Sequence, residues 1–393
     1  MDRRLITLAL GMFALGTDSF VFGGILPSIA GYYHVSIGAA GQLITAYALT
    51  FALLAPTIAA LAAGVPRKRL LLIGMGIFIV ANIGTIFSPS LHVALITRVL
   101  AGIGAATFSP TASGTGTMLV PPERRGFALS IIVAGLTTST ALGTPIGAVI
   151  GGLADWRWSL AFVAALGVAG FVGVWTLLDE VPQPPAISLL KRFAPLADSR
   201  VGLILLTTVL AQVGTFIIYN YVSIVFDRAT GGNPSVLGGL LVLWGLAGTF
   251  SNLLTGRILD KVGSRKVVIV MLSAVVLAIV TMPWSTVNLW TSAIAIFVWG
   301  GCAWGVLVPQ QFRLVSLNPP MAAVLVGLNT SATYIGISIA GVVGATAIPV
   351  IGSHQLGFLA SALVVAAIAM SEIAHRRVSA VKSHNAAKNA AAV

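Results

Sequence analysis

The stretch LGTDSFVFGGILPSIA, Leu15–Ala30, places a single acid within a long apolar run. Asp18 is the only charged side chain among the 62 residues from Leu5 to Pro66. A charged group at the centre of a lipid bilayer costs at least ~2.5 kcal/mol, so an acid in such a position usually marks a pathway or a buried hydrogen bond. The fold around this stretch is therefore the first thing to establish.

The composition excludes a water-soluble fold. Hydrophobic residues make up 57% of the 393 residues and charged residues only 8%, whereas soluble proteins carry roughly 25% charged residues. Twelve apolar segments are long enough to cross a bilayer as helices. They are residues 5–31, 40–63, 70–89, 91–118, 126–152, 158–178, 201–225, 235–256, 266–285, 288–311, 321–349 and 354–374. The sequence predicts an all-α membrane protein with twelve transmembrane helices.

The charges predict how the chain is oriented and divided. Of 22 basic residues, 19 fall on one side of the membrane, Arg313 among them, and Arg98 lies inside a span. By the positive-inside rule, that side and both termini are cytoplasmic. The net charge of +12 therefore reflects topology rather than nucleic-acid binding. We expect six-helix bundles at 1–178 and 201–375, a cytoplasmic central loop at 179–200, and a cytoplasmic tail at 376–393. The end of the tail, His384–Val393, is expected to be disordered.

A weak repeat relates the two halves. The pairs Arg67–Lys68 and Arg265–Lys266 lie in corresponding loops, 198 residues apart. Such a chain suggests two parallel six-helix repeats with a binding site between them at the midplane. The sequence contains no GxxxxGK[ST] motif for ATP, and its five histidines fall in loops or at helix ends. We expect no metal ion and no cofactor.

Asp18 and Arg98 are the candidate proton-coupling residues. Asp18 is the only one of ten acids at the middle of a span, so it is interpreted as a proton-binding site or as the counter-charge for a cationic substrate. The alternative is an acid kept protonated as a hydrogen-bond donor to a neighbouring helix. Arg98 cannot easily lose its proton. It either pairs with Asp18 or caps backbone carbonyls in the first bundle.

Small residues on the fifth span form a second candidate feature. Gly143, Gly147 and Gly151 recur at four-residue spacing with Pro145 among them, so helices can approach closely there and the proline can bend the span. The eleventh span repeats the device, and matching faces would suit two bundles that rock against each other. The candidate substrate-binding residues are polar or amphipathic: Thr17, Gln42, Tyr47, Gln212, Tyr219, Asn220, Trp244, Gln310, Asn329 and Tyr334.

Four segments resemble signatures of the major facilitator superfamily, and the resemblance extends over essentially the whole chain. They are GRILDKVGSRK at Gly256–Lys266, ITRVLAGIGAA at Ile96–Ala106, ALGTPIGAVIGG in the fifth span and GTDSFVFGGILPSIA in the first. The likeness is greatest to bacterial twelve-helix drug:proton antiporters, especially sugar-efflux and chloramphenicol-resistance-like exporters. Two positions depart from the pattern. The first-half loop lacks the acid and glycine of the signature, and Ser19 stands where related exporters often carry the acid.

The resemblance implies a proton-coupled exporter in the inner membrane of a bacterium, and not an enzyme. A monomer embedded in the lipid bilayer would exchange protons for small amphipathic molecules, such as drugs or sugar-like metabolites, by alternating access. Residues of the loop after the eighth span would hold one conformation: Gly256, Arg257, Asp260, Lys261, Gly263, Arg265 and Lys266. Two alternatives stay open. One is a facilitator or importer of small neutral metabolites such as sugars or nucleosides, and the other is a non-transporting membrane sensor.

Overall fold

The computed structural model describes residues 2–62, 64–181 and 188–391. Within these ranges the chain is helical and contains no strand. Eleven helical segments there are long and apolar enough to cross a membrane. The predicted ninth span is formed by α13, Ser264–Val280, which is 17 residues long, and by α14, Met282–Ser285. The expected all-α membrane fold is confirmed.

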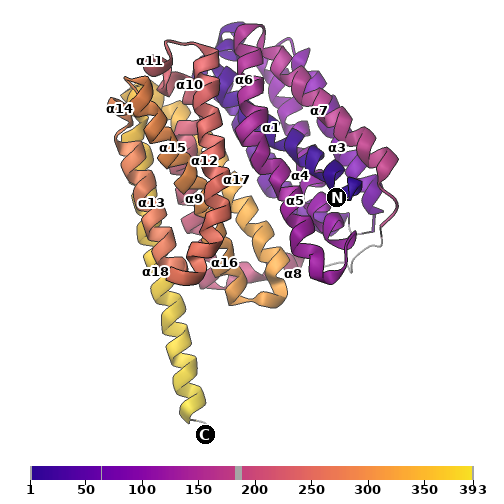
Figure 1. The fold of residues 1–393 in the computed structure, drawn as a ribbon, viewed down its shortest axis with the longest axis vertical. Coiled ribbons are helices and arrows are strands. Elements are labelled where there is room, and N and C mark those ends of the chain that lie inside the picture. The colour runs from indigo at the N-terminus through magenta and orange to yellow at the C-terminus, as the bar shows by residue number, and fades with distance from the viewer. Residues whose placement is uncertain (1, 63, 182–187, 392–393) are drawn as a thin grey trace.

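The helices form two groups that stand side by side in Figure 1. The first bundle contains α1 Arg3–Tyr33, α2 Ile37–Leu61, α3 Arg67–Ile86, α4 Leu91–Met118, η1 Pro122–Arg124, α5 Arg125–Thr138, the π-helical turn η2 Ser139–Gly143, α6 Thr144–Leu153 and α7 Trp156–Leu177. The connection to the second bundle carries α8 Leu189–Phe193 and η3 Ala194–Ala197. Residues 182–187 of the predicted central loop lie outside the described part of the chain.

The second bundle shows where the predicted boundaries need correction. Besides α13 and α14 it contains α9 Ser199–Asn220, α10 Val222–Val225, α11 Asp227–Thr230, α12 Pro234–Val262, α15 Leu289–Gly305, α16 Leu307–Leu317, η4 Pro319–Met321, α17 Ala322–Ile351, η5 Ser353–Gln355 and α18 Leu356–Ala391. α12 continues six residues beyond the expected end at residue 256, because a helix does not have to stop where its apolar part does. The tenth span is broken at Val306.

Capping side chains explain many of the helix starts. Ser36 accepts a hydrogen bond from the backbone N–H of Ala39, and Asp198 accepts one from that of Arg200. Asn233 caps α12 in the same way. These side chains satisfy backbone donors that have no partner in the first turn of a helix. Short polar residues therefore fix the turns between successive spans.

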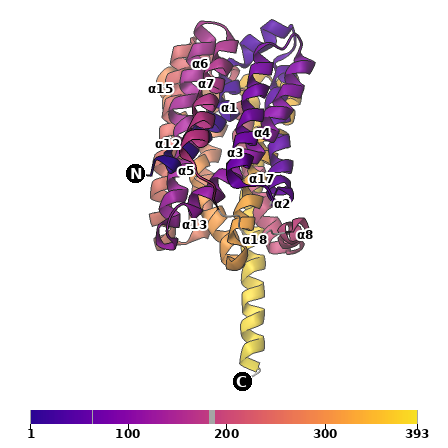
Figure 2. The ribbon, with the colours of Figure 1, turned by 90° about the vertical axis from the view of Figure 1, so that its right-hand side faces the viewer.

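The tail prediction is corrected by α18, which is helical as far as Ala391 and projects beyond the other helices in Figures 1 and 2. The sequence predicts disorder from His384 onward because this segment is short and polar. It is also rich in alanine, which has the highest helix propensity of any residue. The apolar span and the tail therefore share one continuous helix. Residues 392–393 lie outside the described part of the chain.

Several helices of the two bundles lie against one another. We call the end that carries Arg67 and Arg125 the basic end and the opposite end the far end. α2 lies against α17, and η2 and α6 lie against α12. A Cβ on Gly38 would stand 3.0 Å from that of Ala345, and a Cβ on Gly245 would overlap the backbone of Ala141. These close approaches lie between the midplane and the far end.

Candidate functional site

An ion pair between Asp18 and Arg98 lies inside the first bundle. Asp18 is at the middle of α1, and Arg98 reaches it from α4. Nη1 of Arg98 donates a hydrogen bond of 2.9 Å to Oδ1 of Asp18, and the two side chains are 1% and 0% exposed. Of the two arrangements left open for Arg98, the structure contains the direct pair.

Two aromatic rings complete the surroundings of the guanidinium group. Its Cζ lies 4.3 Å from the ring centre of Phe22 and 4.6 Å from that of Tyr47. The negative faces of such rings attract a cation and partly replace water. Within the described residues, Oδ2 of Asp18 and Nε of Arg98 are buried without a hydrogen-bond partner. One carboxylate oxygen is therefore free to accept a proton, whereas a guanidinium keeps its own.

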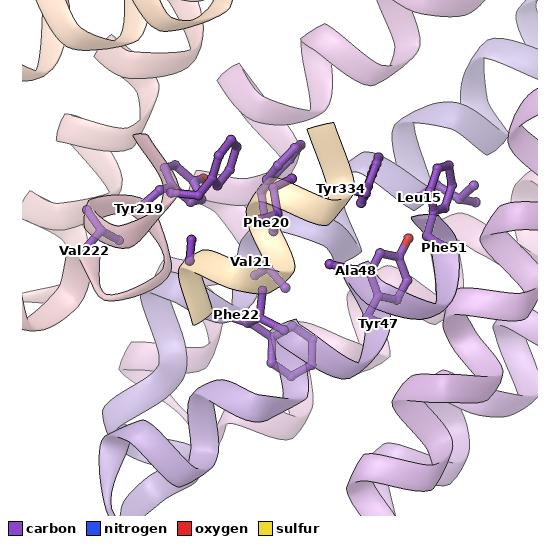
Figure 3. Close-up of a cluster of buried hydrophobic side chains, with 14 of the residues drawn as sticks. Leu15, Phe20, Val21, Phe22, Tyr47, Ala48, Phe51, Tyr219, Val222 and Tyr334 are labelled. Carbon is purple, nitrogen blue, oxygen red and sulfur yellow. The ribbon is translucent and has the colours of Figure 1, made fainter. Parts of the chain in front are cut away.

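Three hydroxyl groups join the ion-pair region to the second bundle. The hydroxyl of Ser19 on α1 lies 3.1 Å from that of Tyr47 on α2 and 3.4 Å from that of Tyr334 on α17. Phe51 stacks on Tyr334 with ring centres 4.0 Å apart. Tyr47, Phe51 and Tyr334 form one group in Figure 3. The residue next to Asp18 thus takes part in a polar contact that crosses between the bundles.

Tyr219 and Trp244, two of the predicted substrate residues, lie in an aromatic group that includes Phe20. The ring centre of Tyr219 is 5.8 Å from that of Phe20 and 4.4 Å from that of Trp244. Phe20 follows Asp18 by two positions, which is about 200° around a helix. α1 therefore presents the acid and the aromatic ring in nearly opposite directions. The hydroxyl of Thr17 donates to a backbone oxygen of α1 itself.

Gln310 and Asn329 lie in a separate polar network of the second bundle. Nε2 of Gln310 donates to the backbone oxygen of Ile204 at 3.2 Å, and the Thr208 hydroxyl donates to Oδ1 of Asn329 at 2.9 Å. Nη1 of Arg313 donates to Oε1 of Gln310 at 3.1 Å. Arg313, assigned from its place in the chain to the cytoplasmic side, is buried here. Gln310 and Asn329, both predicted to bind substrate, are thus hydrogen-bonded to other protein groups.

The remaining polar candidates also have protein partners. Nε2 of Gln42 donates to a backbone oxygen of its own helix. Nδ2 of Asn220 donates to the backbone oxygen of Ile337 at 3.2 Å. Gln212 packs against Gly336, where an added Cβ would stand 2.6 Å from that of Gln212. The contacts of Asn220 and Gln212 join α9 to α17.

The small-residue face of the fifth span packs against α1 within the first bundle. The contacts repeat once per helical turn: Gly143 with Thr17, Gly147 with Val21 and Gly151 with Ile25. In the second bundle, Gly336 of α17 lies equally close to α9. The surface of this span that faces α12 is a different one, carrying Ala141 and Val149. The matching faces therefore join helices within each bundle.

The fifth span changes its helical geometry at the depth of Thr17. The backbone N–H of Thr144 bonds to the oxygen of Ser139, five residues back, which makes a π-helical turn. Pro145 follows and has no N–H to donate to the preceding turn. Isolated π-helical turns occur frequently at functional sites. This turn lies directly against the part of α1 that carries the acid.

The predicted loop cluster lies exposed at the basic end. Arg265 pairs with Glu372 of α18 at 2.5 Å, so the pair joins α13 to α18. In the described part of the chain, no ion pair within 4.0 Å involves the other charged members, Arg257, Asp260, Lys261 and Lys266. Gly263 ends α12 at φ +81°, a conformation that favours glycine, and Gly256 has open space at its Cβ position.

Comparison with known proteins assigns the fold and its general activity. Residues 8–341 match the family model described as Major Facilitator Superfamily. The chain belongs to this family. It is therefore a multi-pass membrane transporter and not an enzyme. The predicted two-bundle fold of the family is confirmed.

Relatives of this transporter include proteins from several bacteria. YdhP, an inner membrane transport protein of Escherichia coli strain K12, is 30% identical over 360 residues, which are 91% of each chain. A probable sugar efflux transporter of Helicobacter pylori strain P12 is 25% identical over 368 residues, 93% of each chain. Among solved structures, the nucleoside transporter NupG matches with a TM-score of 0.77 at 12% identity, covering 94% of this chain and 98% of NupG. This last likeness shows the fold alone.

Sequence reasoning missed the contacts of several residues in this transporter. Ser19 was noted only as a departure from the family pattern, although its hydroxyl contacts those of Tyr47 and Tyr334 beside the acid. Phe22 gave no signal, since an aromatic residue in an apolar helix is usually part of the core. The burial of Arg313 was not predicted, because its position near a helix end is typical of exposed basic residues. In each case the missing information is which way the helix faces.

Proposed function

We propose that this transporter is a proton-coupled exporter of small amphipathic molecules, such as drugs or sugar-like metabolites. It would work as a monomer in a bacterial inner membrane by alternating access. The basic end, both termini and the loop cluster would face the cytoplasm, as the positive-inside rule requires. The inner-membrane relative from Escherichia coli and the relative named as a probable sugar efflux transporter support this location and direction.

The observation that carries the proposal is the buried pair of Asp18 and Arg98. Only the acid of this pair can change its charge within the ordinary pH range. When Asp18 is protonated, Arg98 loses its anionic partner and the hold of α4 on α1 weakens. When Asp18 is ionised, attraction between the charges pulls the two helices together. Protonation is thereby linked to helix position, which an antiporter requires.

The conformation suits one half of such a cycle. The bundles are in close contact toward the far end, and the acid is paired and shielded from water. In the proposed cycle this arrangement would be the state in which Asp18 is ionised. Opening the far end would bring Asp18 into contact with outside water, where it takes up a proton as substrate leaves. Without such an opening the acid cannot exchange protons at all, so the mechanism requires the movement.

The proton gradient is large enough to drive this exchange. One charge crossing the membrane releases about 2.3 kcal/mol per 100 mV. Each pH unit adds about 1.36 kcal/mol, from the conversion between proton concentration and free energy. A gradient of one unit with a potential of 100 mV would thus supply about 3.7 kcal/mol, which concentrates a neutral substrate several hundredfold.

Transport in proteoliposomes tests the coupling. A substrate would first be found by expressing the protein in an efflux-deficient host and screening growth against antibiotics, dyes and sugar analogues. Asp18→Asn should then lose uphill transport driven by a pH gradient while it keeps substrate counterflow. Glu123→Gln, which removes an exposed acid, should keep both activities. Uphill transport by Asp18→Asn at the wild-type rate would refute the proposal.

Facilitated entry or exit of a neutral metabolite is the second candidate. The shielding of Asp18 by Arg98 favours it. In that case the ion pair holds the first bundle together and does not exchange protons. Counterflow that is unchanged by an ionophore, with no uphill movement in a pH gradient, would identify this function.

A further inference from the structure

Two arginines from different parts of the chain come together at the basic end. Arg67 is the first residue of α3, and Arg192 belongs to α8 in the connection between the bundles. α8 lies against α2, as Figure 2 shows. Arg192 is near enough to Arg67 for the two positive charges to repel each other. The fold thus holds like charges together, which costs free energy unless an anion lies between them.

The guanidinium of Arg67 has no partner within the described residues. It lies along α4, where an added Cβ on Gly114 would stand 3.7 Å from Nη1 and 3.9 Å from Nη2, and the side chain is half-buried. No ion pair within 4.0 Å involves it there, and it makes no hydrogen bond to a described residue. An arginine keeps its charge and has only donors. Arg67 therefore has its charge and its N–H groups available for a ligand.

The loop that begins α3 contains no acid to balance these charges. Residues 61–69 read LAAGVPRKR, with Lys68 and Arg69 following Arg67. The corresponding loop of the second bundle carries Asp260 among its basic residues. α8 adds Lys191 to the positive charge of the first-bundle loop. This part of the basic end is therefore cationic by its own composition, and it suits an anionic partner.

The leucines of α8 indicate where that partner comes from. Leu189 and Leu190 are exposed, Leu190 to 84%, and they stand directly before Lys191 and Arg192. Apolar side chains beside basic ones are typical of a segment that lies at a membrane surface. The membrane span of α3 also begins at Arg67. The two arginines thus lie at the level of the lipid headgroups, and the leucines of α8 can contact acyl chains.

A phosphate group fits the chemistry of two arginines. The planar fork of a guanidinium matches phosphate oxygens in pairs, and such charge-assisted hydrogen bonds are among the strongest in proteins. A phosphodiester has one negative charge and two free oxygens, so it can bind two guanidinium groups at once. Basic pockets between membrane helices bind anionic headgroups by these interactions.

We propose that Arg67 and Arg192 bind the phosphate of an anionic phospholipid at the basic end. The acyl chains of this lipid lie beside the leucines of α8. The bound phosphate replaces repulsion between the arginines with attraction and thereby holds α8 against the first bundle. This inference does not depend on the substrate of the transporter, on the direction of transport or on proton coupling.

Mass spectrometry under non-denaturing conditions tests the inference on the purified full-length protein in a neutral detergent. Phosphatidylglycerol and phosphatidylcholine with identical acyl chains are compared, because only the first carries a net negative charge. Wild type should bind the first molecule of phosphatidylglycerol about tenfold more tightly. Inorganic phosphate at constant ionic strength should not displace it. Equal affinity for both lipids, or displacement by inorganic phosphate, would overturn the lipid as the ligand.

Single substitutions locate the lipid. Arg67→Gln removes one fork and one charge, so the affinity for phosphatidylglycerol should fall about tenfold. Arg192→Gln should have a similar effect, and Arg67→Lys, which keeps the charge but not the fork, a smaller one. Arg124→Gln is the matched control, because Arg124 is an exposed residue at the basic end of the same bundle and its loss changes the net charge equally. Equal losses in Arg67→Gln and Arg124→Gln would mean general attraction to the basic end and would overturn the site.

Thermal unfolding separates binding from a structural role of Arg67. Without lipid, Arg67→Gln should unfold at the same temperature as wild type or a higher one, because it removes a repulsion. Phosphatidylglycerol should raise the unfolding temperature of wild type more than that of the variant. A large loss of stability without lipid would mean that Arg67 holds the protein itself together, which contradicts the inference. Asp18→Asn should bind the lipid as wild type does, so a failure of proton coupling leaves this site in place.

Discussion

The two bundles each bury an arginine, and they stabilise it in different ways. Arg98 in the first bundle is paired with a carboxylate and covered by two aromatic rings. Arg313 in the second donates to Gln310 at 3.1 Å and to the hydroxyl of Ser371 at 2.8 Å. It also donates to the backbone oxygen of Ser371 at 3.1 Å.

The difference bears on the proposed proton coupling. The neutral partners of Arg313 do not titrate in the physiological range, so this arginine has a fixed role in joining α16 to α18. The partner of Arg98 can take up a proton and thereby change the net charge of the site. The first bundle therefore contains the titratable pair, and the second contains a buried arginine whose hydrogen-bond acceptors are neutral.

The largest expected effect is that of Arg98→Met. Removing one partner of a buried ion pair leaves the other charge unpaired, which destabilises a protein by about 3–5 kcal/mol. We expect a strongly lowered unfolding temperature in detergent at neutral pH. The double variant Asp18→Asn with Arg98→Met should recover most of the loss, because no buried charge then remains. Equal stability of the single and double variants would contradict the pairing.

Arg313→Met should have a smaller effect. It leaves neutral acceptors unpaired, at about 1–3 kcal/mol, and does not strand a charge. The unfolding temperature should fall less than for Arg98→Met, and the pH dependence of transport should keep its wild-type shape. A shifted pH profile in this variant would mean that the second bundle also takes part in coupling. That result would contradict the claim that only the pair in the first bundle responds to protons.

Gly245→Val tests the contact that closes the far end. Its side chain would overlap the backbone of Ala141, and overpacking of this kind costs about 1–3 kcal/mol. We expect the bundles to separate at the far end, so a cysteine introduced at Val149 in a Cys302→Ser background should react faster with an impermeant maleimide. Gly239→Val on the same helix is the control, since its Cβ position is open. Equal labelling of both variants would exclude this contact as the closure.

The smallest expected effect is that of Glu372→Gln. Its pair with Arg265 lies at the exposed basic end, with side chains 24% and 52% exposed. Exposed ion pairs contribute little to stability, because water and salt screen them. The unfolding temperature should stay within the error of the measurement, and coupling should be unchanged. A large loss of transport would instead give the loop cluster a direct role in switching.

The fold was predictable because each transmembrane segment can be recognised separately from its own residues. Each apolar segment is bounded by charged residues, glycine or proline, and twelve such segments define the architecture without any knowledge of contacts. Asp18 and Arg98 could be selected for the same reason, since each stands alone in an apolar helix. Their pairing could not be derived, because they are 80 residues apart and the rotation of each helix is set by packing.

Packing partners were the least predictable part of the site. The spacing of Gly143, Gly147 and Gly151 correctly indicates a close helix contact, but the same spacing fits a contact within a bundle or between bundles. Likewise, the composition of an indole in an apolar helix does not tell whether its N–H has an acceptor. Ser19 became recognisable only through its distances to two tyrosines on other helices.

The turn-by-turn fit of α6 onto α1 has a mechanical consequence. Val21 of α1 packs directly against Gly147 of α6, where an added Cβ would stand 2.7 Å from the Val21 side chain. Sliding one helix along the other would therefore produce a steric clash. The strip of α6 that packs against α12 and the strip of α1 that carries Asp18 thus belong to two tightly packed helices. If the proposed opening separates α6 from α12, the same movement would displace the carboxylate of Asp18.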